Sequence, residues 1–231
     1  MRKVITILAL LCLSIISLNV FSKENKEAMS IKLPDIKIST NKPLNRLLQK
    51  RQSLRKFSNK KLTLEQISSL LWAAIGEKVD AVSSASRTVP SAGASYPVEV
   101  YLYVQGDTVD VLKSGFYHYL SGTHSLNSLP VKINNEEIIS SCWDQGFIAQ
   151  APIVIIVVAN FEKTTSRYGK RGQRYVYIDA GHVGQNLYLM ATQLGLVTVE
   201  VGAFDDFRLA ECLKLPKPLK PILVMPVGYA F

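Results

Sequence analysis

The pattern of apolar and polar residues predicts alternating helices and strands over most of the chain. Thr63 and Gln66 form a capping box ahead of apolar positions at helical spacing, so we expect a helix over 64–75. Residues 153–159 are an uninterrupted, mainly β-branched apolar run, typical of a central strand buried on both faces. Residues 173–194 carry the longest helical pattern, which stops at a glycine.

Shorter patterns complete this framework. The elements mix without the regular repeat of a parallel sheet, and no G-x-G-x-x-G motif follows any strand. The pattern therefore favours an α+β domain over residues 44–231 rather than a doubly wound nucleotide-binding fold. We expect short helices over 44–50 and 206–213, and strands over 98–104, 115–120, 197–201 and 222–227.

The N-terminus has the layout of a secretory signal peptide. Arg2 and Lys3 precede a nearly continuous apolar stretch, and a polar segment follows Ser22. We expect a signal peptide over residues 1–22, then a tether and an extended arm over 23–43. The protein is then exported to a periplasmic or extracytoplasmic compartment. The apolar stretch approaches the length of a short membrane span, so an uncleaved leader that anchors the protein is the alternative.

Charge and cysteine content add little beyond this. The chain has 27 Lys and Arg against 18 Asp and Glu, a net charge of +9, but they are scattered and match no nucleic-acid-binding motif. We expect no nucleic acid partner. Cys142, Cys212 and the histidines lack the spacing of metal ligands, so no metal site is predicted. Whether Cys142 and Cys212 pair is left open by the sequence.

A basic run ahead of the helix at 64–75 is the first candidate for chemistry. In an extended segment Arg51, Ser53 and Arg55 point the same way, because side chains alternate along a strand. Two guanidinium groups and a hydroxyl on one side suit a phosphate dianion. The alternative is an ordinary solvated basic surface.

Two further segments favour a bound ligand. Between Arg87 and Pro97, small residues bracketed by prolines give a narrow backbone, centred on residues 90–93, that can lie against a flat ligand. Residues 179–191 read as a mostly buried helix in which Gly181 and Gly184 allow close packing against another helix or chain.

In this order, the segments resemble the nitroreductase family of FMN-dependent oxidoreductases, and most nearly its azoline oxidase branch, the SagB-type dehydrogenases. The matching motifs are R-x-S-x-R at 51–55, R-T-V-P-S-A-G-A-x-Y-P at 87–97 and D-A-G-H-x-x-Q-N-L at 179–187. Residues 115–119 and 194–204 match as well, so the resemblance covers about residues 44–231.

The resemblance implies a nitroreductase-like fold, with a central, mostly antiparallel sheet flanked by helices, and a homodimer with FMN at the subunit interface. Arg51, Ser53 and Arg55 would then hold the phosphate and ribityl chain. The turn at Gly202 and Ala203 would place backbone N–H groups near the reactive flavin nitrogen. The proline loop would run along the ring system through Pro90, Ser91, Ala92 and Gly93.

Three positions depart from the family pattern. Ala94 stands where many members have an asparagine, and no Lys or Arg follows the last strand, which leaves Arg171 and Arg174 as candidate substitutes. Arg167 and Tyr168 replace the Lys-Tyr pair of azoline oxidases. Arginine stays protonated and cannot act as a base, whereas Tyr168 can still donate a proton.

The leading hypothesis is an exported FMN-dependent oxidoreductase that moves hydride from a donor to a small organic acceptor. NAD(P)H is one candidate donor, and by analogy the acceptor is a nitro compound or a quinone. One alternative is an azoline-type peptide dehydrogenase, against which the missing lysine base argues. The other is a non-catalytic flavin- or ligand-binding module of the same fold. Reduction of bound flavin by a donor separates the enzymes from the module.

Overall fold

The computed structural model describes residues 30–36, 43–78 and 86–231. The predicted signal peptide over 1–22 lies outside the described residues, as does most of the predicted tether and arm. No helix in the described part is both long enough and apolar enough to cross a membrane.

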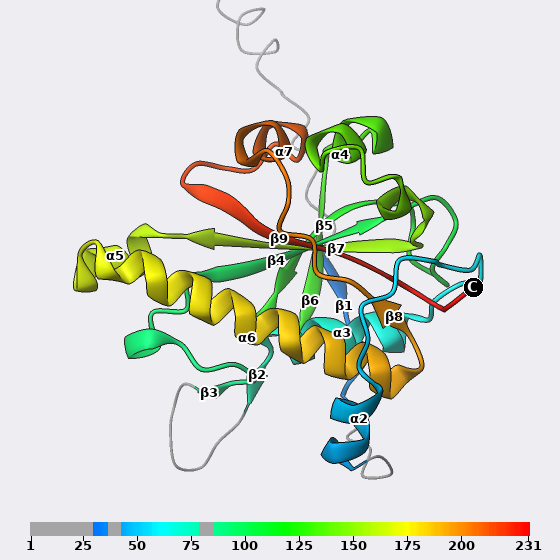
Figure 1. The fold of residues 1–231 in the computed structure, drawn as a ribbon, viewed down its shortest axis with the longest axis horizontal. Helices are drawn as coiled ribbons and strands as arrows, with labels where there is room; N and C mark the ends of the chain where they lie inside the picture. Colours follow the sequence, from blue (N-terminus) through cyan, green and yellow to red (C-terminus); the bar gives the residue numbers. More distant parts are fainter. Residues whose placement is uncertain (1–29, 37–42, 79–85) are drawn as a thin grey trace, which may run out of the picture.

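A single seven-stranded sheet forms the centre of the domain (Figure 1), with strand order β1-β6-β5-β4-β7-β9-β8. Every neighbouring pair is antiparallel, which confirms the expected α+β fold with an antiparallel sheet. A small hairpin, β2 (Glu77–Lys78) and β3 (Ser86–Arg87), stands apart from it. The strands of the main sheet are β1 (Ser30–Lys32), β4 (Val98–Val104), β5 (Gly115–Leu120), β6 (Ser125–Leu129), β7 (Ile153–Asn160), β8 (Val197–Thr198) and β9 (Leu219–Gly228).

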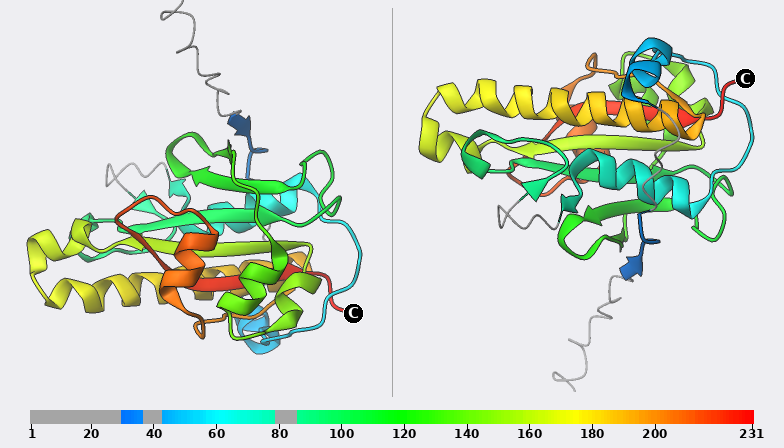
Figure 2. Two further views of the ribbon diagram at one scale, coloured as in Figure 1. Left: turned by 90° about the horizontal axis from the view of Figure 1, so that it is seen from above. Right: turned by 90° about the horizontal axis from the view of Figure 1, so that it is seen from below.

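Helices cover both faces of the sheet (Figures 1 and 2). The longer helices α3 (Leu64–Ile75) and α6 (Arg171–Leu194) lie on one face. The short helices α4 (Asn135–Ser141) and α7 (Asp206–Cys212) lie on the other. Two more short helices, α2 (Leu44–Lys50) and α5 (Glu162–Tyr168), lie near the C-terminal and N-terminal ends of α6.

Strand β7 explains why the sheet needs both layers. Alternate side chains of a strand point to opposite faces. Ile155 and Val157 pack in the hydrophobic cluster beneath α3 and α6, whereas Ile156 and Val158 pack in the cluster beneath α4 and α7. All four are fully buried, which confirms the central strand predicted from the apolar run.

The first described residues form an arm along the far edge of the sheet. β1 pairs with β6, the Leu33 side chain is buried, and the Ser68 hydroxyl donates to the Pro34 carbonyl over 2.6 Å. Of the arm predicted within 23–43, the structure shows the stretch Ser30–Lys32 as an extended strand. Cys142 and Cys212 are both free.

Five predicted elements have different bounds in the structure. β7 ends at Asn160 rather than 159, α7 ends at Cys212 rather than 213, and the last strand, predicted over 222–227, is β9 (Leu219–Gly228). The strand expected over 197–201 was wrong after Thr198: Glu200 leaves the sheet to donate its N–H to the Tyr188 hydroxyl. Val201 rejoins by a single bridge to Val224. The long helix begins at Arg171 rather than 173, and it includes Gly172, where an added Cβ would lie 2.8 Å from the Thr165 Cα of α5.

Candidate functional site

The basic run lies at the sheet edge next to β8. Ser53 forms a parallel bridge with Thr198, and the Leu54 N–H donates to the Thr198 carbonyl over 3.0 Å. Further along, the Ser58 N–H donates to the Tyr229 carbonyl over 3.0 Å. Backbone hydrogen bonds therefore hold the segment extended, as the sequence predicted.

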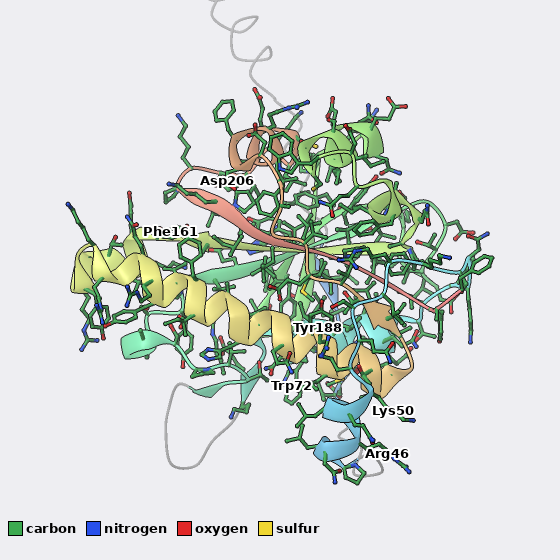
Figure 3. The ribbon with its side chains drawn as sticks, viewed as in Figure 1. Arg46, Lys50, Trp72, Phe161, Tyr188 and Asp206 are labelled. Atoms are coloured by element: carbon green, nitrogen blue, oxygen red, sulfur yellow. The ribbon has the colours of Figure 1, made fainter. Side chains whose placement is uncertain are left out.

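Tyr188 of α6 joins this run to the segment that follows β8. Its side chain is only 8% exposed, and its hydroxyl lies 2.8 Å from the Ser53 hydroxyl. The same oxygen accepts the Glu200 N–H over 2.8 Å. Figure 3 shows Tyr188 on the C-terminal part of α6. No sequence motif pointed to it, because a tyrosine in a buried helix normally reads as a core residue.

The two arginines of the run have aromatic neighbours rather than acidic ones. The Arg51 guanidinium carbon lies 5.1 Å from the centre of the Tyr188 ring, and that of Arg55 lies 5.6 Å from the centre of the Phe147 ring. Within the described ranges, neither arginine forms an ion pair. Both positive charges are therefore uncompensated, as expected for residues that bind an anion.

Further cations lie close to this position. Arg46 and Lys50 of α2 line a cavity of about 330 Å³ together with Tyr188 and Thr198 (Figure 3). Arg174, in contrast, precedes Tyr188 by fourteen residues on α6, or about 21 Å at 1.5 Å per residue. Arg171 is farther still. In one chain, α2 rather than the start of α6 therefore supplies the additional positive charge near Arg51.

The turn after β8 presents free backbone donors. Gly202 and Ala203 are exposed, and neither N–H has an acceptor among the residues that the structure describes. The turn is held from behind, since Gln145 donates to the Ala203 carbonyl over 3.1 Å and the Asp205 N–H donates to the Ser141 carbonyl over 2.8 Å. Such fixed donors suit a site of developing negative charge.

Glu200 stands at the entry to this turn. Its carboxylate lies against Gly184 of α6, where an added Cβ would collide with it. Burial raises the pKa of this carboxyl above its ordinary value. Gly184 therefore provides space for a carboxylate, which is a different role from the close helix packing expected for it. Gly181 has no atom within 4 Å of its added Cβ.

The proline loop is a strained backbone held by α6. Gly93, Ala94 and Tyr96 have φ values of 57°, 53° and 42°, in the left-handed region that costs about 1–3 kcal/mol for residues other than glycine. The Ser91 hydroxyl donates to the Asp179 carboxylate over 2.6 Å and accepts the Tyr96 N–H over 3.0 Å. These contacts fix the conformation of the loop.

Asp179 is the buried anchor of this loop, and its side chain is 4% exposed. Burial raises the pKa of its carboxyl. The hydrogen bond from the Ser91 hydroxyl, the charge of His182 and the hydrogen bond from the Ala92 N–H each lower that pKa, but by less than burial raises it. The D-A-G-H motif therefore has a structural reason: its aspartate binds the loop.

The candidate catalytic residues lie against the same loop. The Arg167 Nη1 donates to the Gly93 carbonyl over 3.2 Å, and its guanidinium carbon lies 5.3 Å from the centre of the Tyr168 ring. A Cβ added to Gly93 would collide with the Tyr168 hydroxyl and the Arg167 guanidinium. The structure thus brings Arg167 and Tyr168 to the proline loop.

The predicted site residues form two groups along α6. Arg51, Ser53 and the Glu200 N–H, which leads into the turn, gather around Tyr188, whereas the proline loop gathers around Asp179 and Arg167 contacts that loop. Nine residues separate Asp179 from Tyr188, or about 13 Å along the helix. In the described ranges, no cluster of three or more His, Cys, Asp or Glu side chains is placed to hold a metal ion.

The chain is similar to known proteins over most of its length. The Nitroreductase family model matches residues 48–229. A protein of Methanocaldococcus jannaschii named as a nitroreductase is 45% identical over 202 residues, which are 87% of this chain and 97% of that protein.

Solved structures share the fold. A nitroreductase-like protein of Ralstonia eutropha superposes with a TM-score of 0.73 at 28% identity, over 87% of this chain and 90% of that one. A chain of the Escherichia coli microcin synthetase McbBCD complex, solved with truncated pro-MccB17 bound, superposes with a TM-score of 0.66 at 26% identity, over 90% and 79% of the two chains. The protein described here therefore belongs to the nitroreductase family of oxidoreductases.

Proposed function

We propose that this oxidoreductase binds FMN and uses it to move hydride from a donor to a small organic acceptor. The observation that carries the proposal is that Tyr188 joins an arginine without an acidic partner to the segment that leads into a turn whose backbone N–H groups have no acceptor among the described residues. A phosphate needs the first and a reduced flavin ring needs the second.

The phosphate end would lie at Arg51 and Ser53, with Arg55 toward the ribityl chain. Arginine binds phosphate through two parallel N–H donors, and here its charge is not neutralised by a neighbouring carboxylate. Arg46 and Lys50 line the cavity beside Tyr188 and would add positive charge to the phosphate site.

The ring end would lie between the turn and the proline loop. The free N–H groups of Gly202 and Ala203 would stabilise negative charge that develops on a reduced ring. The backbone of Pro90, Ser91 and Ala92, fixed by Asp179, would lie along the ring edge. When bound, the flavin supplies the hydride chemistry, and the chain binds and orients it.

Tyr168 and Arg167 would act on the acceptor side. Arg167 keeps its positive charge and cannot accept a proton, but it can attract an electron-rich acceptor. The Tyr168 hydroxyl, held beside Gly93, can donate a proton to the reduced product.

We also propose a homodimer in which each flavin site takes the Tyr188 group from one chain and the proline loop from its partner. The separation of the two groups along α6 supports this arrangement. The outer face of α6 carries Tyr177 and Ile178, which are 57% and 48% exposed, and α2 exposes Leu44 and Leu48. Exposed apolar side chains in such numbers are typical of an interface.

The predicted leader places the enzyme outside the cytoplasm, where free nicotinamide nucleotide is scarce, so the donor screen should include quinols as well as NADH and NADPH. Nitroaromatics and quinones are the acceptors to test first. Fractionation of cells checks the location, and N-terminal sequencing of the exported protein checks whether residues 1–22 are removed.

The test begins with the absorbance spectrum of the purified protein. We expect a yellow protein that releases FMN on denaturation, and Arg51→Ala or Arg55→Ala should each weaken FMN binding by roughly 1.5–3 kcal/mol, the scale of a hydrogen bond to a charged group. Arg208→Ala on α7 is the matched control and should bind FMN normally. A colourless wild-type protein that fails to take up FMN would refute the proposal.

Azoline-type oxidation of a peptide is the second candidate. It is favoured by the similarity to the microcin synthetase complex, which was solved with a peptide precursor bound. Arg167 argues against it, because a base is needed where arginine stands. If it were correct, Arg167→Lys would raise the oxidation of a thiazoline peptide. Absence of turnover by the wild type on any azoline would remove this candidate.

A further inference from the structure

The Tyr188 hydroxyl contacts both the basic run and the segment leading to the turn. It meets the Ser53 hydroxyl on one side and the Glu200 N–H on the other, each at 2.8 Å. Its ring is buried beneath the Arg51 guanidinium. A phenol at this position can control the direction of the hydrogen bonds around it.

Counting hydrogens settles that direction. A phenol has one hydrogen to donate and can accept on its oxygen. The Glu200 N–H already donates to Tyr188, and within the described part of the chain Ser53 is the acceptor in reach of the Tyr188 hydrogen. Buried polar hydrogens are almost always paired, so Tyr188 donates to Ser53. The hydrogen of the Ser53 hydroxyl is then free to point outward, where no described side chain takes it.

We propose that Tyr188 is a positioning residue that sets the Ser53 hydroxyl as an outward donor for the phosphate of the cofactor. This inference rests on the proposed function, because it assigns Ser53 to the phosphate. Without the phenol, the Ser53 hydroxyl can rotate toward neighbouring backbone carbonyls, and part of its preorganisation is lost.

The experiment compares FMN with riboflavin, which lacks the phosphate. The quantity to measure is the ratio of the two dissociation constants, because it isolates the phosphate contribution from effects on the ring. Tyr188→Phe should reduce the preference for FMN by about 5- to 20-fold, which is part of the roughly 10- to 150-fold effect of one whole hydrogen bond to a charged group. Ser53→Ala should reduce it by at least as much.

The double variant supplies the decisive readout. If Tyr188 acts through Ser53, adding Tyr188→Phe to Ser53→Ala should change the preference by less than about 2-fold, because residues that act through one contact are not additive. Tyr117→Phe is the matched control, since this tyrosine is also buried and its hydroxyl donates to the Lys113 carbonyl over 2.7 Å. It should leave the preference unchanged.

Equal losses in the wild-type and Ser53→Ala backgrounds, or an unchanged preference in Tyr188→Phe, would overturn the inference while leaving FMN binding itself intact. If Tyr188→Phe does not fold, Tyr188→Leu gives the same comparison with a strong helix former. A wild type that binds neither flavin overturns the proposed function, and this inference with it.

Discussion

Among single residues, Gly93 has two roles that a substitution can distinguish: its backbone is left-handed, and it leaves space for the Tyr168 and Arg167 side chains. Alanine at this position would adopt a left-handed conformation, at a cost of about 1–2 kcal/mol, and its Cβ would push aside Tyr168 and Arg167. Both are long side chains that can move, so we expect little further loss of stability. Turnover should fall by about 10-fold or more, because Tyr168, the proposed proton donor, is displaced.

Gly106→Ala is the matched control for this variant. Its φ of 63° is similar, but no atom lies within 4 Å of the added Cβ. Urea unfolding should therefore give similar losses for the two variants, whereas steady-state rates with a quinone should fall only for Gly93→Ala. Equal activity in both variants would remove Tyr168 and Arg167 from the site.

Asp179 gives a prediction on pH. Burial raises its pKa above the ordinary 3.8, so the folded state holds the proton more firmly than the unfolded chain does. The contribution of Asp179 to stability is then greatest below pH 3.8 and is lost as pH rises through the folded pKa. Asp179→Asn has no such titration, so its stability relative to wild type should increase as pH rises from about 4 to 7.

The measurement is urea unfolding at several pH values. Both proteins should carry His182→Gln, because this exposed histidine lies one helical turn from Asp179 and its charge lowers the pKa of that carboxyl. Parallel profiles for the two proteins would show that the carboxyl has an ordinary pKa in the folded state.

The sequence predicted individual site residues where a motif marked them, but it did not predict contacts between residues far apart in the chain. Arg51, Ser53 and Gly93 stand out because charge, alternation and proline spacing mark them. Tyr188 lies at a buried position of α6 where the sequence shows only an amphipathic pattern, and the motif that contains Asp179 did not indicate that this aspartate holds the proline loop. Their partners come from segments far away in the chain, and no local pattern encodes such contacts.

At the scale of an element, two glycines of helix α6 differ in what surrounds them. Gly172 faces the backbone of α5, whereas Gly184 faces the flexible carboxylate of Glu200 and a methyl group of Leu223 at 3.3 Å. Replacing glycine by alanine in a helix normally stabilises it by about 0.5–1 kcal/mol. We expect Gly184→Ala to change stability by less than about 0.5 kcal/mol, because Glu200 can move away.

Gly172→Ala should instead cost about 1–3 kcal/mol, since backbone atoms of α5 cannot yield without separating the two helices. Denaturant midpoints of the two variants provide the comparison, each serving as the control for the other. Equal midpoints would mean that α5 is not held tightly against α6.

The elements with strong patterns were predicted and the polar ones were not. The capping box fixed the start of α3, and the apolar run identified β7. Strand β6 and helix α5 have mixed polar sequences without a clear period, so tertiary packing decides their conformation. For α5, this packing is the contact of the fully buried Thr164 with Gly172 of α6.

In the whole molecule, the distance between the two groups of site residues is the feature that a single sequence could not give. The motifs identified both groups, and family resemblance predicted a dimer. Only the structure shows that the Tyr188 and Asp179 groups lie at different positions along α6, about 13 Å apart. This arrangement makes the shared site testable with two defective variants.

Mixing Arg51→Ala with Gly93→Ala should restore activity if each site is shared between two copies. In a mixed dimer one site then contains both defects, and the other combines an intact Arg51 with an intact Gly93. After free exchange of subunits about half of the dimers are mixed, so about a quarter of all sites are intact. At an FMN concentration that does not saturate Arg51→Ala, we expect turnover to recover to about a quarter of the wild-type rate. Sites built within one chain would each keep a defect, and the mixture would then be no more active than the average of its two components.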